Sequence, residues 1–103
     1  MDVLTPRQLL AAIDAASAPR ILDVRTEAEF AAGHVPGAIN VPFQRVGTLS
    51  ADRRAPLIVY CGHGPRAWIA GRLLRRRGFT AIRYLRGHMA GWRRAGLPEA
   101  HGA

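Results

Sequence analysis

One short stretch constrains this chain more than any other, the segment 57–77 with a cysteine near its start. Residues 57–60 are apolar and mostly β-branched, which predicts a buried strand. Cys61 follows directly, two glycines and Pro65 then force a tight loop, and the pattern predicts an amphipathic helix over 66–77. In such a strand–loop–helix unit, backbone N–H groups and the helix dipole converge on one concavity that favours negative charge.

Cys61 is the only cysteine among the 103 residues, and its position in this loop predicts a reactive thiolate. The loop N–H groups and Arg66 would stabilise a charged sulfur, so we expect this thiol to ionise more readily than a free cysteine. The alternative is a small, buried hydrophobic residue at a strand end. The glycine-rich turn and the basic start of the helix favour the thiolate.

Strands and helices are predicted to alternate along the whole chain. Capping boxes at Thr5–Gln8 and Thr26–Glu29 predict two helix starts, and Gly78 predicts a left-handed end for the helix over 66–77. The expected strands are 3–4, 20–24, 38–41, 57–60 and 79–84, and the other expected helices are 5–16, 26–32 and one that opens at 87. This alternation indicates an α/β domain with a mainly parallel sheet.

In parallel sheets, ligands bind outside the carboxyl ends of the strands. Arg25, Cys61 and the loop around Arg86 come at such ends, so we expect three distant segments to converge on one pocket. On the helix over 66–77, the spacing predicts a core face and an opposite, solvated face of arginines. The predicted core residues are Ile69, Ala70, Leu73 and Leu74, with Trp68, Met89 and Trp92 expected in the core or in a pocket wall.

Length and composition indicate one domain over residues 1–103, with 99–103 as a flexible tail. No apolar run approaches the ~18 residues that cross a membrane, no signal peptide is visible, and a single cysteine forms no internal disulfide, so we expect a cytoplasmic protein. The formal charge of +8 favours anionic partners. No nucleic-acid-binding motif accompanies the charge, so small anions are favoured over nucleic acid, and the scattered histidines indicate no metal site.

Several motifs together resemble one known family. They are 22–25 (LDVR), 29–30 (EF), 33–42 (GHVPGAINVP), 59–61 (VYC), Gly64, Arg66, 85–87 (LRG), Trp92 and 96–98 (GLP). In this order they resemble the rhodanese, or sulfurtransferase, domain over nearly the whole chain. The resemblance implies a three-layer α/β domain with a five-stranded parallel sheet, without a metal or an organic cofactor.

The reaction that the resemblance implies is transfer of sulfane sulfur. Cys61 would attack a small anionic donor such as thiosulfate, carry a persulfide, and pass the sulfur to cyanide, a small thiol or a protein thiol. Substrate-binding positions are expected at Arg25, at His88, and along the loop and helix start, namely Gly62, His63, Gly64, Pro65, Arg66 and Ala67. By its position at a strand end, Arg25 is interpreted first as a structural hydrogen-bonding partner. His63 is equally compatible with a solvent-facing spacer.

Two other functions remain open from the sequence. One is a binding or sulfur-relay module that serves a protein partner, and the other is a phosphatase or arsenate reductase that uses cysteine. Those phosphatases and reductases place five residues between Cys and Arg, whereas four stand here, which favours sulfur transfer. Two departures from the family pattern are Ala67 where a serine is common and His88 where a glycine is usual. We expect His88 to project into the pocket mouth and narrow the choice of acceptor. The oligomeric state is not indicated.

Overall fold

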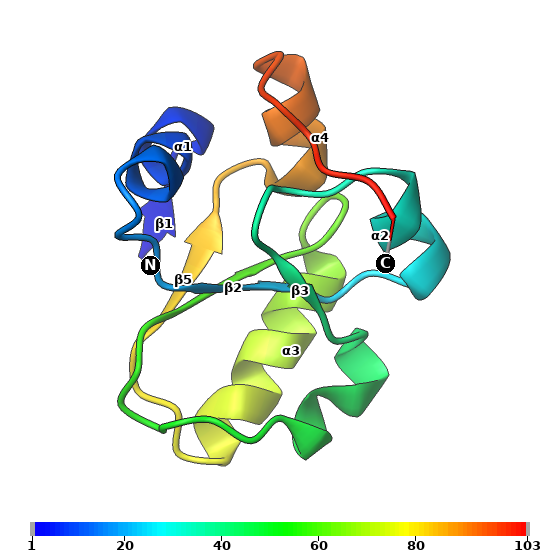
Figure 1. The fold of residues 1–103 in the computed structure, drawn as a ribbon. Helices are drawn as coiled ribbons and strands as arrows, with labels where there is room; N and C mark the ends of the chain where they lie inside the picture. Colours follow the sequence, from blue (N-terminus) through cyan, green and yellow to red (C-terminus); the bar gives the residue numbers. More distant parts are fainter. Residues whose placement is uncertain (1, 103) are drawn as a thin grey trace.

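The computed structural model describes residues 2–102, which form a five-stranded parallel sheet with helices on both faces (Figure 1). The strands are β1 (Val3–Leu4), β2 (Arg20–Asp23), β3 (Ile39–Asn40), β4 (Leu57–Tyr60) and β5 (Ile82–Leu85). They lie in the order β1-β5-β4-β2-β3, and every pairing is parallel. The predicted α/β fold is confirmed, and β4 occupies the centre of the sheet.

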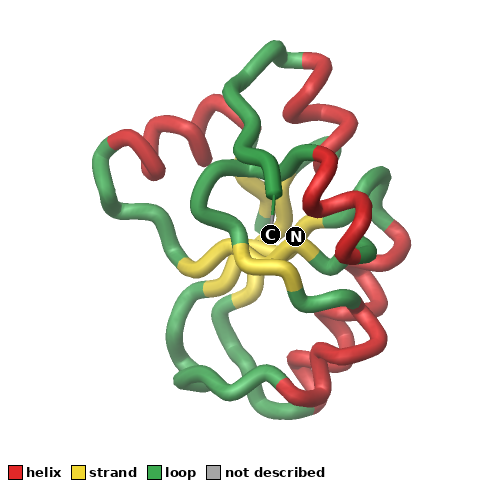
Figure 2. Tube along the Cα trace, turned by 45° about the vertical axis from the view of Figure 1, so that its right-hand side comes forward, coloured by secondary structure: helices red, strands yellow, loops and turns green. Residues whose placement is uncertain are grey.

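Helices cover the sheet in two layers. Helices α1 (Pro6–Asp14) and α4 (His88–Arg94) lie on one face, whereas α3 (Pro65–Arg76) and the 3₁₀ helix η1 (Phe43–Thr48) lie on the other, and short α2 (Glu27–Ala32) follows β2 (Figure 1 and Figure 2). Successive residues of β4 alternate between two hydrophobic cores, Val59 under α3 and Ile58 with Tyr60 under α1 and α4. No helix within residues 2–102 is long and apolar enough to span a bilayer.

The local signals in the sequence form as predicted. Thr5 and Gln8 exchange backbone and side-chain hydrogen bonds at the start of α1, and Thr26 and Glu29 do the same at the start of α2. Gly78 ends α3 at φ 96°, a left-handed conformation that suits glycine. Both predicted capping boxes and the predicted helix end are therefore confirmed.

The strand predicted over 79–84 begins three residues later than expected. The N–H of Phe79 donates to the carbonyl of Leu74, which closes the last turn of α3 instead of entering a strand. The ring of Phe79 is nonetheless buried in the core under α3.

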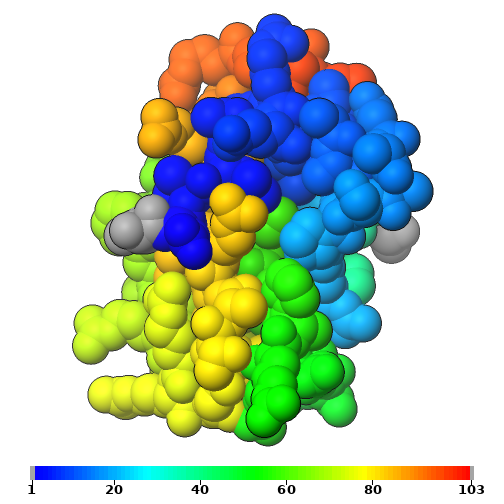
Figure 3. Space-filling view, turned by 90° about the vertical axis from the view of Figure 1, so that its left-hand side faces the viewer, coloured from blue at the N-terminus to red at the C-terminus, as the bar shows by residue number. Residues whose placement is uncertain are grey.

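The predicted core face of α3 is partly wrong. Ile69 and Leu73 are 47% and 40% exposed, and Trp68 is 50% exposed, while the sheet is met by Ala67, Ala70, Gly71 and Leu74. Figure 3 shows the lime-to-yellow segment of α3 with long side chains standing out from the surface. Small residues face the sheet because α3 approaches it closely. A Cβ on Gly71 would lie only 2.0 Å from the hydroxyl oxygen of Tyr84.

The flexible tail predicted over 99–103 is instead held by hydrogen bonds in the part that the structure describes. Ala100 forms an antiparallel bridge with His34, with N–H···O distances of 2.9 and 2.8 Å, and the N–H of Gly102 donates to Ala31. Glu99 pairs with Arg93 of α4. The residues up to 102 therefore hold the loop after α2 in place, whereas Ala103 lies outside the described residues.

Candidate active site

Cys61 lies directly after β4, at the carboxyl edge of the sheet, as the sequence predicts. Its side chain is buried, with 1% of the residue exposed, and its sulfur accepts the N–H of Gly64 at 3.0 Å. The N–H of Cys61 itself donates to Nδ1 of His88 at 3.2 Å. The sulfur thus lies under the loop that follows it, with one amide hydrogen directed at it.

The conformation of this loop depends on Gly64. Its φ of 139° is one that residues with a Cβ rarely adopt, and a Cβ there would lie 3.4 Å from Nε2 of His88 and 3.6 Å from the Trp68 ring. The next residue, Pro65, is the first of α3 and has no N–H to offer. The sequence predicts several loop amides around the sulfur, but within the described chain only the Gly64 amide hydrogen-bonds Sγ.

The loop is also fixed from the side of α4. The N–H groups of Met89 and Ala90 donate to the carbonyls of Cys61 and Gly62 at 2.9 and 3.2 Å. Together with the bond to His88, they join the first turn of α4 to the cysteine loop by three hydrogen bonds. The loop is therefore held between α3 and α4, which brings together the segments around 61 and 87 that sequence analysis expects at one pocket.

Arg66 forms an ion pair that the sequence analysis does not predict. Its guanidinium donates to both carboxylate oxygens of Glu29, at 2.6 and 3.1 Å, across 37 residues of sequence. The hydrogen bonds from Arg66 hold the pKa of Glu29 at about 2 instead of 4.5, against the opposing effect of burial. Glu29 in turn raises the pKa of Arg66. The sequence marks Glu29 by its place in the α2 capping box and in the 29–30 motif, but neither signal indicates a pair with Arg66.

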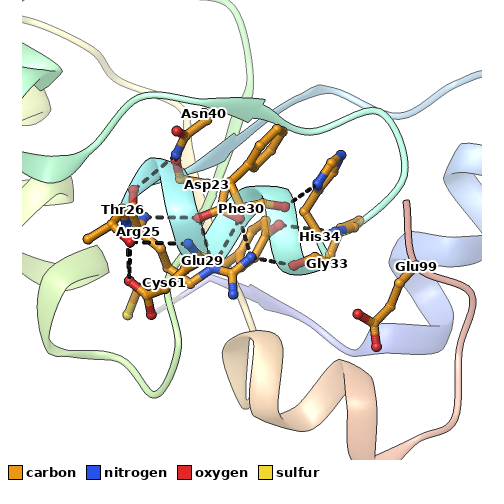
Figure 4. A network of polar contacts seen from close by, with 12 residues as sticks. Asp23, Arg25, Thr26, Glu29, Phe30, Gly33, His34, Asn40, Cys61 and Glu99 are labelled. Carbon is orange, nitrogen blue, oxygen red and sulfur yellow. Dashed lines mark hydrogen bonds and ion pairs between the residues drawn. The ribbon is translucent and has the colours of Figure 1, made fainter. Parts of the chain in front are cut away.

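Arg25 lies at the same edge but is held by its own partners. Its guanidinium bonds the carboxylate of Asp23 at 2.7 to 3.1 Å and the carbonyl of Gly33 at 2.7 Å, in the network of Figure 4. Both side chains of the pair are buried. Burial alone would lower the pKa of Arg25, but the hydrogen bond and charge of Asp23 raise it. These contacts agree with the interpretation of Arg25 as a structural hydrogen-bonding partner. Among the described residues, the Arg25 guanidinium forms no hydrogen bond to the cysteine loop, and its part in substrate binding stays a prediction.

His88 is buried beside the cysteine loop at the start of α4. Because Nδ1 accepts the N–H of Cys61, this nitrogen carries no proton and the neutral ring carries its proton on Nε2. Burial, and then the nearby charge of His63, lower the pKa of His88, which favours the same neutral form. The residue holds φ at 55°, a left-handed conformation uncommon outside glycine.

The remaining predicted positions divide between surface and core. His63 and Pro65 are exposed, Gly62 is partly buried, and Ala67 is fully buried in the core under α3 together with Cys61. Ala67 was expected in substrate binding, but its methyl group faces the core. Of the three large side chains expected in the core or a pocket wall, Met89 and Trp92 are buried and Trp68 lies half exposed next to the loop.

A hollow of about 800 Å³ between α2 and β3 does not contain the cysteine. Phe30, His34 and Ile39 are among its lining residues. The candidate site lies instead at the sulfur, the amide that faces it and the nearby ion pair, because this hollow holds no nucleophilic thiol. Among residues 2–102, no three side chains of His, Cys, Asp or Glu gather as metal ligands.

The site combines three features that together define a class of α/β domains. They are a cysteine directly after a central parallel strand, a four-residue loop, and a helix with an arginine in its first turn. The family model described as "Rhodanese-like domain" matches residues 5–95 of this chain. The chain belongs to the rhodanese-like domain family, as its motifs predict.

Individual relatives carry different names. A protein of Allochromatium vinosum named "Sulfurtransferase" is 34% identical over 82 residues, covering 76% of this chain and 75% of the relative. A protein of Mycobacterium tuberculosis named an HTH-type transcriptional regulator is 36% identical over 108 aligned positions, covering 99% of this chain but 46% of the relative. The solved structure of a thiosulfate sulfurtransferase from Pseudomonas aeruginosa superposes with a TM-score of 0.86 at 30% identity, covering 100% of this chain and 21% of that one.

Proposed function

We propose that this protein is a sulfurtransferase that carries sulfane sulfur as a persulfide on Cys61. The observation that carries the proposal is the Cys61 sulfur, which accepts the Gly64 N–H at 3.0 Å inside a four-residue loop that ends at Arg66. The thiolate is the nucleophilic form of a cysteine, and an N–H aimed at the sulfur can donate a hydrogen bond to the negative charge there as the sulfur reacts. The family match and a relative named as a sulfurtransferase support the same activity.

In the first step, the Cys61 thiolate attacks the outer sulfur of an anionic donor such as thiosulfate. A sulfur–sulfur bond forms at Cys61, the bond from that sulfur to the sulfonate group breaks, and its electron pair leaves with sulfite. In the second step, a thiolate or cyanide attacks the outer sulfur of the persulfide and regenerates the Cys61 thiolate. The enzyme alternates between two covalent states, so we expect ping-pong kinetics.

Different residues of the loop and helix start stabilise the negative charges of the sulfur and of the donor. The Gly64 N–H stabilises charge on the attacking sulfur, and donor and acceptor approach from the outer side of the loop, where His63 and Pro65 are exposed. The planar fork of Arg66 matches the sulfonate end of the donor. Glu29 already occupies this fork, so the donor must share or displace Glu29 to bind Arg66.

We propose that His88 limits which acceptors can reach the persulfide on Cys61. The N–H at Nε2 of His88 lies near Gly64, so it can donate a hydrogen bond to an anion bound at the loop. His88→Gly should change the ratio of rates among cyanide, a small thiol and a larger thiol. Equal ratios for the two proteins would remove this role from His88.

A second candidate is a sulfur-relay or sulfur-sensing module that acts on a dedicated protein. It is favoured by the buried sulfur and by the relative named as a transcriptional regulator, in which the matching region is less than half of the protein. Such a module would accept sulfur on Cys61 but turn over slowly with small acceptors.

Intact-protein mass spectrometry after incubation with thiosulfate tests the proposal. We expect an adduct of about 32 Da on Cys61, absent from Cys61→Ser and removed by cyanide. Turnover with small acceptors then separates the enzyme from the relay module. No adduct with any sulfane donor would contradict both, and phosphate release from an aryl phosphate would instead favour the phosphatase alternative.

A further inference from the structure

Helix α3 presents a mixed apolar and basic surface immediately after the cysteine loop. We define the α3 outer face as Trp68, Ile69, Arg72, Leu73 and Arg76. At 100° per residue, these five positions fall within an arc of about 140° of the helix, opposite the residues that pack on the sheet. Four of them, Ile69, Arg72, Leu73 and Arg76, line a shallow hollow of about 190 Å³. The face is therefore continuous, and it is hollowed.

The exposure of its apolar side chains calls for a partner. Trp68, Ile69 and Leu73 are 50%, 47% and 40% exposed, and they are three of the four large hydrophobic residues exposed among residues 2–102. Single exposed hydrophobic residues are ordinary, but a cluster rimmed by charge marks an interaction site. Tryptophan and arginine are also the residues enriched where interfaces bind most strongly.

The charge of this face specifies its partner. Within residues 2–102, no carboxylate lies in ion-pair range of Arg72 or Arg76, in contrast to Arg25, Arg45, Arg66 and Arg93. A second copy of this chain would bring the same two arginines together on a protein of formal charge +8. An acidic segment with its own apolar side chains would instead cover the tryptophan and leucine and neutralise both cations.

The position of the face specifies what the partner does. Trp68 lies beside Gly64, and Leu73 lies about 12 Å along the axis of α3 from Pro65. A segment bound along α3 therefore ends next to the loop that covers Cys61. A thiol at that end of the segment would be held close to the persulfide, which raises its effective concentration.

We infer that the α3 outer face binds an acidic, amphipathic segment of the protein that accepts sulfur from Cys61. This inference rests on the proposed function for its chemistry, because it requires a persulfide on Cys61. The step is an attack by the segment's thiolate on the outer sulfur of that persulfide, which releases the Cys61 thiolate. Recognition on α3, however, requires no sulfur and can be measured separately.

The probes are two synthetic amphipathic peptides that each end in a cysteine, with the same leucines but with either glutamates or lysines. The protein is first incubated with thiosulfate so that Cys61 carries a persulfide. The rate of sulfur transfer from this persulfide to each peptide and to glutathione is then measured. We expect the acidic peptide to react at least tenfold faster than the basic one. The variant Arg72→Glu/Leu73→Ser/Arg76→Glu should lose this preference and keep its rate with glutathione.

A matched variant controls for net charge. Arg7 and Arg20 are exposed arginines outside α3, so Arg7→Glu/Arg20→Glu makes the same charge change as the α3 variant but should retain the preference. Equal rates for both peptides, or an equal loss in both variants, would overturn the inference. Two other results would also overturn the inference. Self-association through α3 in sedimentation would assign the face to a second copy of the chain, and binding to vesicles of anionic lipid through α3 would assign it to a membrane.

Binding without transfer separates this inference from the proposed function. The acidic peptide should change the fluorescence of Trp68, which is half exposed, whereas Trp92 is fully buried. If Cys61 takes up no sulfur but the fluorescence responds to the acidic peptide and not to the basic one, the proposed function fails and the docking face stands. If Cys61 takes up sulfur and neither peptide is bound, the docking face fails alone.

Discussion

Replacement of Glu29 by glutamine removes one charge from the candidate site while it preserves the shape of the side chain. The carboxylate receives two hydrogen bonds from Arg66, and these are the main reason that the pKa of Glu29 lies at about 2 instead of 4.5. Glutamine at this position can still complete the capping box with Thr26. Glu29→Gln therefore tests the ion pair separately from the start of α2.

The size of the effect follows from this pKa. A fall from 4.5 to about 2 corresponds to about 3.4 kcal/mol if it is fully expressed as stability. The carboxylate side chain is 39% exposed, and Thr26 supplies part of the stabilisation that glutamine retains, so screening leaves an expected loss of about 1 kcal/mol at pH 7. For a domain of this length, the melting temperature should fall by about 4–8 °C.

The pH dependence has a definite sign. Because the folded state lowers the pKa of Glu29, the stabilisation is fully present above about pH 4.5 and is lost as the pH falls towards 2. Thermal melts of the parent and of Glu29→Gln should therefore differ at pH 7, and the gap between them should narrow below about pH 4.5 and nearly close at about pH 2. A gap in melting temperature that stays constant from pH 7 to pH 3 would refute the assignment to the ion pair.

A nearby carboxylate provides the control. Glu27 pairs with Arg45, but their side chains are 78% and 57% exposed, so Glu27→Gln should change the melting temperature little at any pH. Arg66 is also free to bind anions once Glu29 is neutral. We therefore expect a lower KM for thiosulfate in Glu29→Gln, measured by sulfite release, and an unchanged KM would show that Glu29 does not compete with the donor.

Three further substitutions test the packing around the site. Gly71→Ala should cost about 1–3 kcal/mol in urea unfolding, because its Cβ would lie 2.0 Å from the Tyr84 hydroxyl, and the cost should shrink in a Tyr84→Phe background. Gly64→Ala should cost about 1–3 kcal/mol through its φ of 139°, and should also slow alkylation of Cys61 at neutral pH by moving the amide that faces the sulfur; an unchanged melting temperature and alkylation rate would contradict it. Asp23→Asn should cost about 3–5 kcal/mol, because Arg25 would remain buried without a counter-charge, and a loss below 1 kcal/mol would show that water reaches the pair.

The features that the sequence predicts well are those determined within a few residues. The capping boxes at Thr5 and Thr26, and the left-handed end of α3 at Gly78, depend on contacts three to five positions apart. The place of Cys61 at the carboxyl edge follows from one buried strand and one glycine-rich loop. These features need no knowledge of the distant chain, so they can be read from the sequence directly.

The face of α3 could not be predicted from hydrophobicity alone. The helical period marks Ile69 and Leu73 as core residues because they are large and apolar. The approach of α3 to the sheet is instead limited by volume, since Gly71 lies against Tyr84 and only small side chains fit there. The larger side chains are displaced to the outer face by this close packing.

The partner of Arg66 could not be predicted either, for a different reason. Glu29 is 37 residues away from Arg66 in the sequence and lies in a different helix, α2. The rule that strand ends converge places Arg25 and Cys61 at one edge, but it does not say which charges pair there. Arg25 forms an ion pair with Asp23, two residues earlier, whereas Arg66 forms one with Glu29.

The environment of Cys61 is set by α4 as much as by α3. Met89 and Ala90 fix the carbonyls of the loop, and His88 accepts the N–H of Cys61 at the cost of a left-handed backbone at φ 55°. A glycine at this position would relieve that strain, of about 1–3 kcal/mol, but would lose both the hydrogen bond to the buried Cys61 amide and the packing of a buried imidazole. Beyond these opposing effects on stability, His88 places a neutral imidazole with its proton on Nε2 beside Gly64, in the site itself.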